Sequence, residues 1–174
     1  MFRHVEFALV STLFATQFAA AADLPKEGDF KLTFHVVTES RRSIPMPEGQ
    51  FANLNLETLV TTNDAGNGFL HSSTGRCMGM SSGDAKGGHA TGFCTHADAD
   101  GDLIFLTLDV GFQSGSPITG RKTYTGGTGK YAGLNGDSQY TLKRLRSVEK
   151  DGQAVYEGHE DGHYKIQAAE AQRQ

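Results

Sequence analysis

The segment TYTGGTGKYAGLNG, residues 123–136, decides between two fold classes, because its glycines suit either a nucleotide-binding loop or a turn between strands. A P-loop requires glycine, four residues and then Gly-Lys-Ser/Thr, whose hydroxyl reaches the metal ion. Here Gly129-Lys130 is followed by Tyr131, and Tyr124 occupies the position of the first glycine. The segment therefore does not fit a P-loop.

The same glycines match a looser dinucleotide-binding pattern over residues 127–132. That loop works by aiming the N-terminus of a helix at a pyrophosphate. Gly133 and Gly136 lie where this helix would run, and glycine weakens helices. We therefore expect no nucleotide cofactor, and we predict a sharp crossover between two strands, with Tyr131 and Leu134 packed back onto the domain.

Most other segments carry β-strand patterns. Residues 29–39 alternate apolar and polar side chains, which predicts a half-buried strand with one face formed by Phe30, Leu32, Phe34 and Val36 and with Lys31 and His35 on the other. Residues 53–62 continue this period, with Leu54, Leu56, Thr58 and Val60 on one face. Residues 102–112, DLIFLTLDVGF, are apolar on both faces, which suits a strand that is covered on two sides. Further strands are predicted over residues 68–80, 89–97, 120–125, 137–145 and 153–166.

The fold class follows from this series of strands. Consecutive antiparallel strands joined by short turns leave two exposed edges unless the sheet closes. We therefore predict an all-β fold, an eight-stranded antiparallel up-and-down barrel, with a two-sheet sandwich as the alternative. Only residues 168–174, AAEAQRQ, have helical propensity.

The N-terminal residues predict export. Arg3 and His4 precede a short apolar run, and small residues lie before Asp23, as signal peptidase requires. We interpret residues 1–22 as a signal peptide and residues 23–174 as one domain. The mature protein is then expected to be secreted or periplasmic, without a membrane span.

The two cysteines, Cys77 and Cys94, predict one disulfide in an oxidising compartment. If the intervening residues form a hairpin tip, the register that places Met80 opposite Thr91 also places the cysteines opposite each other.

The formal charge of −4 and the brevity of the basic cluster at 142–146 argue against a nucleic-acid partner.

Two motifs suggest metal sites that their surroundings do not support. Residues 159–163, HEDGH, match the His-Glu-x-x-His zinc pattern, but the flanking residues alternate like a strand, so we expect His159 and His163 on a solvated outer face. Residues 98–102, DADGD, resemble part of a calcium loop whose glycine is misplaced. We predict a hairpin turn at Asp100-Gly101 and no metal site.

This hairpin also predicts a strand register. With the turn at residues 100–101, the expected cross-strand pairs are Ala97 with Ile104, Thr95 with Leu106 and Phe93 with Leu108.

A family resemblance rests on the glycine-rich segment. GGTGKYAGLNG, residues 126–136, resembles the GGTG-aromatic-x-G-x-x-G segment of the allene oxide cyclase and dirigent-like barrels, and residues 94–108 are similar to a hairpin of small secreted bacterial proteins grouped with them. The resemblance implies a barrel, often trimeric in characterised relatives, whose lumen accepts an apolar small molecule. Those relatives include a cyclase of epoxy fatty acids and proteins that steer the radical coupling of phenols. No motif here aligns with the catalytic residues of that cyclase.

Two functions remain open at this point. The first is a barrel that binds an apolar or phenolic small molecule or serves as an interaction scaffold, and the second is a cyclase or isomerase that uses the same lumen. The candidate ligand-binding residues are Glu57, Tyr124, Tyr140 and Tyr156, each on an alternating strand. We also expect a homo-oligomer, with a trimer favoured by the resemblance, because the outer face of residues 102–112 is apolar.

Overall fold

The computed structural model describes residues 24–146 and 154–167 of the 174-residue chain. The predicted signal peptide, residues 1–22, and residues 168–174, whose composition has helical propensity, lie outside the described residues. Within the described ranges, no helix has both the length and the apolar character needed to cross a membrane.

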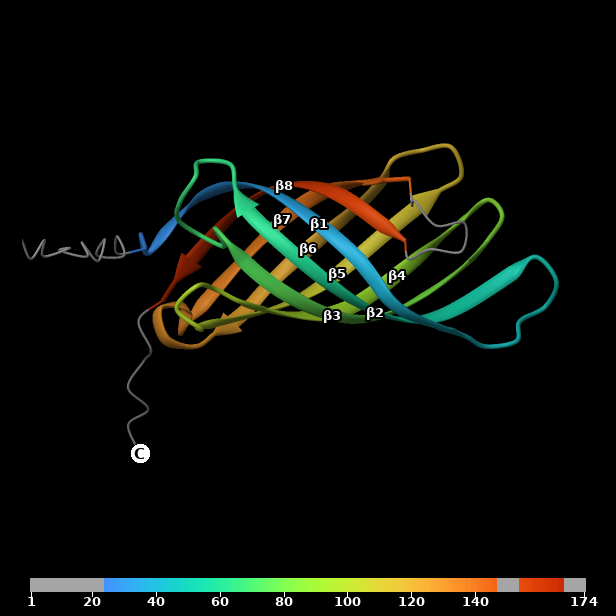
Figure 1. Ribbon diagram of the computed structural model, residues 1–174, viewed down its shortest axis with the longest axis horizontal. Coiled ribbons are helices and arrows are strands. Elements are labelled where there is room, and N and C mark those ends of the chain that lie inside the picture. The colour runs from blue at the N-terminus through green and yellow to red at the C-terminus, as the bar shows by residue number, and fades with distance from the viewer. Residues whose placement is uncertain (1–23, 147–153, 168–174) are drawn as a thin grey trace, which may run out of the picture.

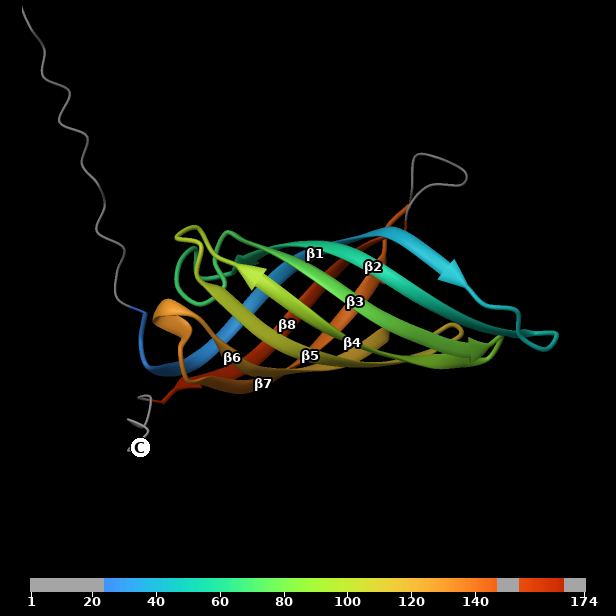
Figure 2. The same cartoon turned by 90° about the horizontal axis from the view of Figure 1, so that it is seen from below.

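Eight strands form one closed antiparallel barrel in which neighbours in sequence are neighbours in space (Figures 1 and 2). The strands are β1 (Glu27–Ser43), β2 (Gln50–Asn63), β3 (Ser73–Asp84), β4 (Gly87–Ala97), β5 (Leu103–Gln113), β6 (Ile118–Gly127), β7 (Leu134–Arg144) and β8 (Val155–Ile166). The barrel closes where β8 pairs with β1, with Gly158 opposite Phe34. The predicted up-and-down barrel is confirmed, and the sandwich alternative is wrong.

The apolar face of β1 points into the barrel. Phe30, Leu32 and Phe34 are buried in the barrel, while Lys31 and His35 point outward. Glycines on neighbouring strands make room for the rings, because Phe34 lies across Gly158, where an added Cβ would overlap the ring. Burial of these large apolar side chains is the main favourable contribution to folding.

In β2, unlike β1, the more apolar face of the strand points out of the barrel. Leu54 and Val60, which share the apolar face seen in the sequence, lie on the outside of the barrel and are 45% and 53% exposed. The inner face instead carries Glu57 and Leu59, because Leu59 lies opposite Val36 in the pairing with β1. A period of two shows which residues share a face, and the pairing with β1 decides which face is inside.

The cysteine hairpin of β3 and β4 has the predicted register. Cys77 lies opposite Cys94 and Met80 opposite Thr91, and the two cysteines form a disulfide. Both are buried on the inner wall of the barrel. Such a bridge fits a protein that folds in an oxidising compartment.

The register predicted for the next hairpin is wrong by one residue. The structure pairs Ala97 with Leu103 instead of Ile104, Thr95 with Phe105 instead of Leu106, and Phe93 with Thr107 instead of Leu108. The cause is a wider loop over residues 98–102, in which the carboxylate of Asp98 accepts hydrogen bonds from the backbone N–H groups of Asp100 and Asp102. Gly101 has the predicted positive φ, at 86°.

The glycine-rich segment is the predicted crossover. It contains one turn of 3-10 helix, η1 (Gly129–Tyr131), and it buries Tyr131 and Leu134 in the barrel. The Lys130 ammonium forms ion pairs with Asp98 at 2.6 Å and Asp100 at 2.5 Å. The two segments that carry the family resemblance therefore hold each other in place at one end of the barrel.

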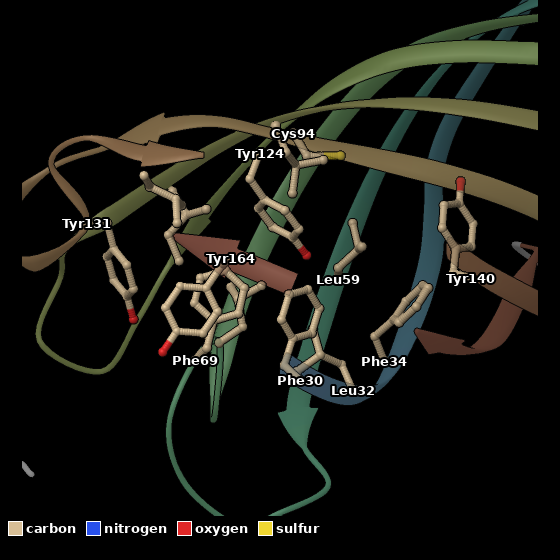
Figure 3. Close-up of a cluster of buried hydrophobic side chains, with 14 of the residues drawn as sticks. Phe30, Leu32, Phe34, Leu59, Phe69, Cys94, Tyr124, Tyr131, Tyr140 and Tyr164 are labelled. Atoms are coloured by element: carbon tan, nitrogen blue, oxygen red, sulfur yellow. The ribbon is translucent and has the colours of Figure 1, made fainter. Parts of the chain in front are cut away.

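A loop closes that same end from within. Residues 64–72 are not part of a strand, although the sequence suggested one from residue 68, because Leu70 and Ser72 adopt positive φ of 57° and 53°. The loop inserts the Phe69 ring among other aromatic rings, stacked on Tyr164 at 4.3 Å between ring centroids (Figure 3). Asn63 donates a buried hydrogen bond to the Phe69 carbonyl. This end of the lumen is filled.

Candidate functional site: a cavity in the barrel lumen

The other half of the lumen contains a cavity of about 270 Å³. Its lining residues place it toward the end of the barrel that carries the loops 44–49 and 85–86. Figure 1 shows that these loops lie at the opposite end from the loop 64–72, whose inserted Phe69 ring we call the Phe69 plug. Its apolar walls come from several strands and include Phe34, Val36, Leu59, Leu108, Val110 and Leu142. Near the outer end, the rings of Phe51 and Phe112 stack at 6.1 Å, and both also line a wider groove outside.

Three of the four candidate residues line this cavity. Glu57 of β2, Tyr140 of β7 and Tyr156 of β8 face it from different strands, although the sequence separates them widely. Tyr124 does not line the cavity, because it is buried toward the plug, where its ring lies 5.3 Å from that of Phe69. The structure therefore divides the candidates between a cavity wall and a packed core.

A buried ion pair forms the boundary between the cavity and this core. Lys122 Nζ lies 2.5 Å from Glu160 Oε2, and the two side chains are only 3% and 0% exposed. The other carboxylate oxygen, Oε1, accepts hydrogen bonds from Tyr124 and Ser138, each at 2.5 Å. Lys122 lines the cavity, and its ammonium lies next to two rings of the cavity wall, those of Phe34 and Tyr140.

Lys122 and Glu160 were not among the candidate residues predicted from the sequence. Lys122 is two residues from Tyr124 on β6 and therefore shares its face, and Glu160 lies between the small inward residues Gly158 and Gly162 on β8. The alternation along β6 and β8 was therefore the only sign in the sequence that Lys122 and Glu160 share a face with inward-pointing residues. It was overlooked because a single charged residue on a strand usually faces solvent.

The network also fixes the protonation of Tyr124. Burial, followed by the charge of Glu160 and the hydrogen bond to it, raises the pKa of Tyr124 well above 10. Tyr124 is therefore a neutral hydrogen-bond donor over the physiological range. The ammonium of Lys122 lies 4.0 Å from the centroid of the Phe34 ring and 5.2 Å from that of Tyr140, so aromatic faces surround it.

Glu57 is a second charged group at the cavity wall. Thr38 on the paired strand donates a hydrogen bond to its Oε1 at 3.4 Å. Burial raises the pKa of Glu57, and this effect outweighs the hydrogen bond of Thr38 and the nearby charge of Arg41. Burial is likewise the main cause that raises the pKa of Tyr140. Both groups therefore favour their neutral forms more than they would in water.

His96 lies outside the cavity. Its side chain is fully buried on β4, packed across Gly75, and neither ring nitrogen has a hydrogen-bond partner among the described residues. Burial, assisted by the charge of Lys122, lowers the pKa of His96 to about 3. The ring is therefore neutral at physiological pH.

The HEDGH segment lies on β8 as the predicted strand. His159 and His163 point to the outside, near Glu157 and Asp29 respectively, whereas Glu160 points inward. A helical zinc site needs these three side chains on one face, which a strand does not allow. Across the described ranges, no group of three or more His, Cys, Asp or Glu side chains is arranged to hold a metal ion.

A continuous apolar face lies on the outside of the barrel over β2, β3 and β4. It consists of Leu54, Met78, Met80 and Phe93, which are 45%, 57%, 66% and 70% exposed. Phe105 on β5, from the segment that is apolar on both faces, is 38% exposed. The described part of the chain thus leaves this outer face largely uncovered.

The sequence matches no family model, and a search of curated proteins finds no match. Solved structures do match. A protein of unknown function from the DUF3224 family of Shewanella oneidensis MR-1 is 17% identical with a TM-score of 0.51, over 82% of this chain and 99% of that one. The pterocarpan synthase dirigent protein GePTS1 is 14% identical with a TM-score of 0.50, over 85% of this chain and 91% of that one. The predicted dirigent-like barrel fold is confirmed, and at these identities the likeness concerns the fold alone.

Proposed function

We propose that this barrel binds a small apolar or phenolic molecule in its lumen. The observation that supports the proposal is the cavity of about 270 Å³, whose mostly apolar wall carries a few placed polar groups. Ligand sites in proteins have this character, with the apolar wall supplying affinity and the polar groups supplying orientation. The cavity lies just below the usual size for drug-like ligands, which favours a small molecule.

Binding can be tested with 4-ethylphenol and toluene, by ligand-observed NMR and calorimetry on the purified barrel. We expect saturable binding with one site per chain. Ala90→Phe should abolish it, because Ala90 lines the cavity and the added ring fills it. Thr95→Phe, at an exposed outward position of the same strand, is the matched control. The proposal fails if neither compound binds, or if both variants bind as well as the native barrel.

A cyclase or isomerase remains the second candidate. One observation favours it, namely that Lys122, Glu57, Tyr140 and Tyr156 line the same cavity. An ammonium that stabilises developing negative charge and a carboxylate that accepts a proton are sufficient for isomerisation next to a carbonyl group. Hydrogen–deuterium exchange at the α-carbon of a bound ketone, followed by NMR and lost in Glu57→Gln, would establish this chemistry.

We also propose that the outer apolar face, Leu54, Met78, Met80 and Phe93, associates with further copies of the chain. Exposed apolar groups of this size are typical of association surfaces. The resemblance noted in the sequence favours a trimer. Light scattering at micromolar concentration should give a multimeric mass, and Phe93→Lys should reduce it to that of one chain. A monomeric native protein would disprove the association.

The disulfide and the N-terminal sequence support a secreted or periplasmic location. An exported chain should begin at Asp23 when it is recovered from the medium or the periplasm, which N-terminal sequencing would show. Recovery of a chain that starts at Met1 would contradict the proposal.

A further inference from the structure

The ammonium of Lys122 has unused hydrogen-bonding capacity at the cavity. An ammonium has three donors. In the part of the chain that the structure describes, one oxygen atom accepts from it, Glu160 Oε2 at 2.5 Å. Its other neighbours include the rings of Phe34 and Tyr140, which line the cavity and whose centroids lie 4.0 and 5.2 Å from Nζ. An acceptor oxygen inside the cavity would therefore gain a charge-assisted hydrogen bond without displacing Glu160.

The charge of Lys122 is already balanced. Glu160 stays in place because Tyr124 and Ser138 both donate to its second oxygen. A carboxylate ligand would bring a second negative charge next to Glu160 in an apolar surrounding, where like charges interact strongly and desolvation is expensive. A neutral acceptor, such as a carbonyl oxygen, avoids this repulsion.

The volume of the cavity limits the size of the ligand. An apolar protein cavity of about 150 Å³ is known to hold one benzene molecule. The cavity of about 270 Å³ therefore accommodates one ring with a few additional heavy atoms. The aliphatic wall suits a ring face, and the polar groups lie at separate points of that wall.

We infer that the lumen selects a neutral single-ring molecule whose acceptor oxygen, typified by an aryl ketone or aldehyde, docks on the Lys122 ammonium. This inference rests on the proposed lumen binding and specifies its ligand class. The ring occupies the space between Leu59, Leu108 and Val110, and the oxygen points toward the ion pair.

Three probe molecules of nearly equal shape separate the effect of a neutral acceptor oxygen from that of ring burial and from that of negative charge. Acetophenone carries a neutral acceptor, α-methylstyrene replaces that oxygen with CH₂, and benzoate replaces the methyl group with a charged oxygen. Their dissociation constants are measured by calorimetry at pH 7. A hydrogen bond to a charged group corresponds to about tenfold or more in affinity, so acetophenone should bind at least that much more tightly than α-methylstyrene. Benzoate should bind more weakly than acetophenone.

The double variant Lys122→Met, Glu160→Gln removes both charges while keeping side-chain volume. It should bind α-methylstyrene as the native barrel does and lose the preference for acetophenone. Lys165→Met, at an exposed lysine on the outside of β8, is the matched control and should keep that preference. If the double variant does not fold, the three probes on the native barrel still decide the question.

The outcomes separate this inference from the proposed function. Equal affinity for acetophenone and α-methylstyrene would overturn docking on Lys122 while leaving lumen binding intact. Tightest binding of benzoate would overturn the selection of neutral molecules. If none of the three binds while toluene or 4-ethylphenol does, this inference alone is overturned, whereas absence of binding by all five compounds would disprove the proposed function as well.

Discussion

Glu160→Gln should be the most damaging conservative substitution in the barrel. The change keeps the shape of the side chain but leaves the ammonium of Lys122 buried without a counter-charge. Breaking a buried ion pair from one side costs about 3–5 kcal/mol. For a domain of this size, with a slope of about 2 kcal/mol per molar urea, the unfolding midpoint should fall by roughly 1.5–2.5 M.

Two variants make this result interpretable. Asp161→Asn, the next residue, removes an outward ion pair with Lys31 whose side chains are 69% and 75% exposed, and it should cost less than about 1 kcal/mol. Lys122→Met, Glu160→Gln should recover most of the loss, because no uncompensated charge remains. The reasoning is refuted if Glu160→Gln costs less than about 1 kcal/mol, or if the double variant is less stable than the single one.

The remaining predictions concern three other sites. Glu57→Gln should raise the melting temperature at pH 7 and leave it unchanged at pH 4, because the raised pKa makes the folded carboxylate costly only above its usual value of 4.5; an equal gain at both values would contradict this. Burial raises the pKa of Asp98, but Lys130 and the hydrogen bonds to Asp98 lower it more, so the pKa in the folded barrel is below the usual 3.8. The ionised Asp98 side chain therefore stabilises the fold above about pH 3.8, and this stabilisation is lost as the pH falls through the pKa of the folded state. Lys130→Met should therefore destabilise the barrel more at pH 7 than at pH 2 in urea titrations, and an equal loss at both pH values would argue for packing instead. Gly158→Ala should cost about 1–3 kcal/mol and weaken ligand binding, because its Cβ displaces Phe34; unchanged binding in calorimetry would count against this.

The fold was predictable because its determinants are local. Alternation identified the strands, and glycine and aspartate identified the turns between them. The cysteine register was correct because one short hairpin fixes it. The register of the next hairpin was wrong because the Asp98 side chain widens the loop, and no pattern of apolar residues records such a hydrogen bond.

The site was only partly predictable, because alternation does not tell which face lies inside. β2 shows this, since its apolar face, with Leu54 and Val60, is outside and Glu57 is inside. Glu57, Tyr140 and Tyr156 were chosen by residue type, and the structure places all three at the cavity wall, while their role as ligand-binding residues stays a prediction. Lys122 and Glu160 were not chosen, because the two side chains pair with each other over the intervening strand β7, a contact between residues 38 positions apart that alternation does not reveal.

The position of the disulfide couples oxidation state to ligand occupancy. Cys77 lies on the cavity wall, so a reducing agent that approaches from the lumen competes with a bound molecule for the same space. A ligand that binds the oxidised barrel better than the reduced one also makes the bridge thermodynamically harder to reduce, in proportion to its saturation. The rate of thiol release in dithiothreitol thus becomes a reporter of lumen filling that requires no label. Under reducing conditions, a barrel that holds such a ligand would therefore keep its disulfide longer than an empty barrel.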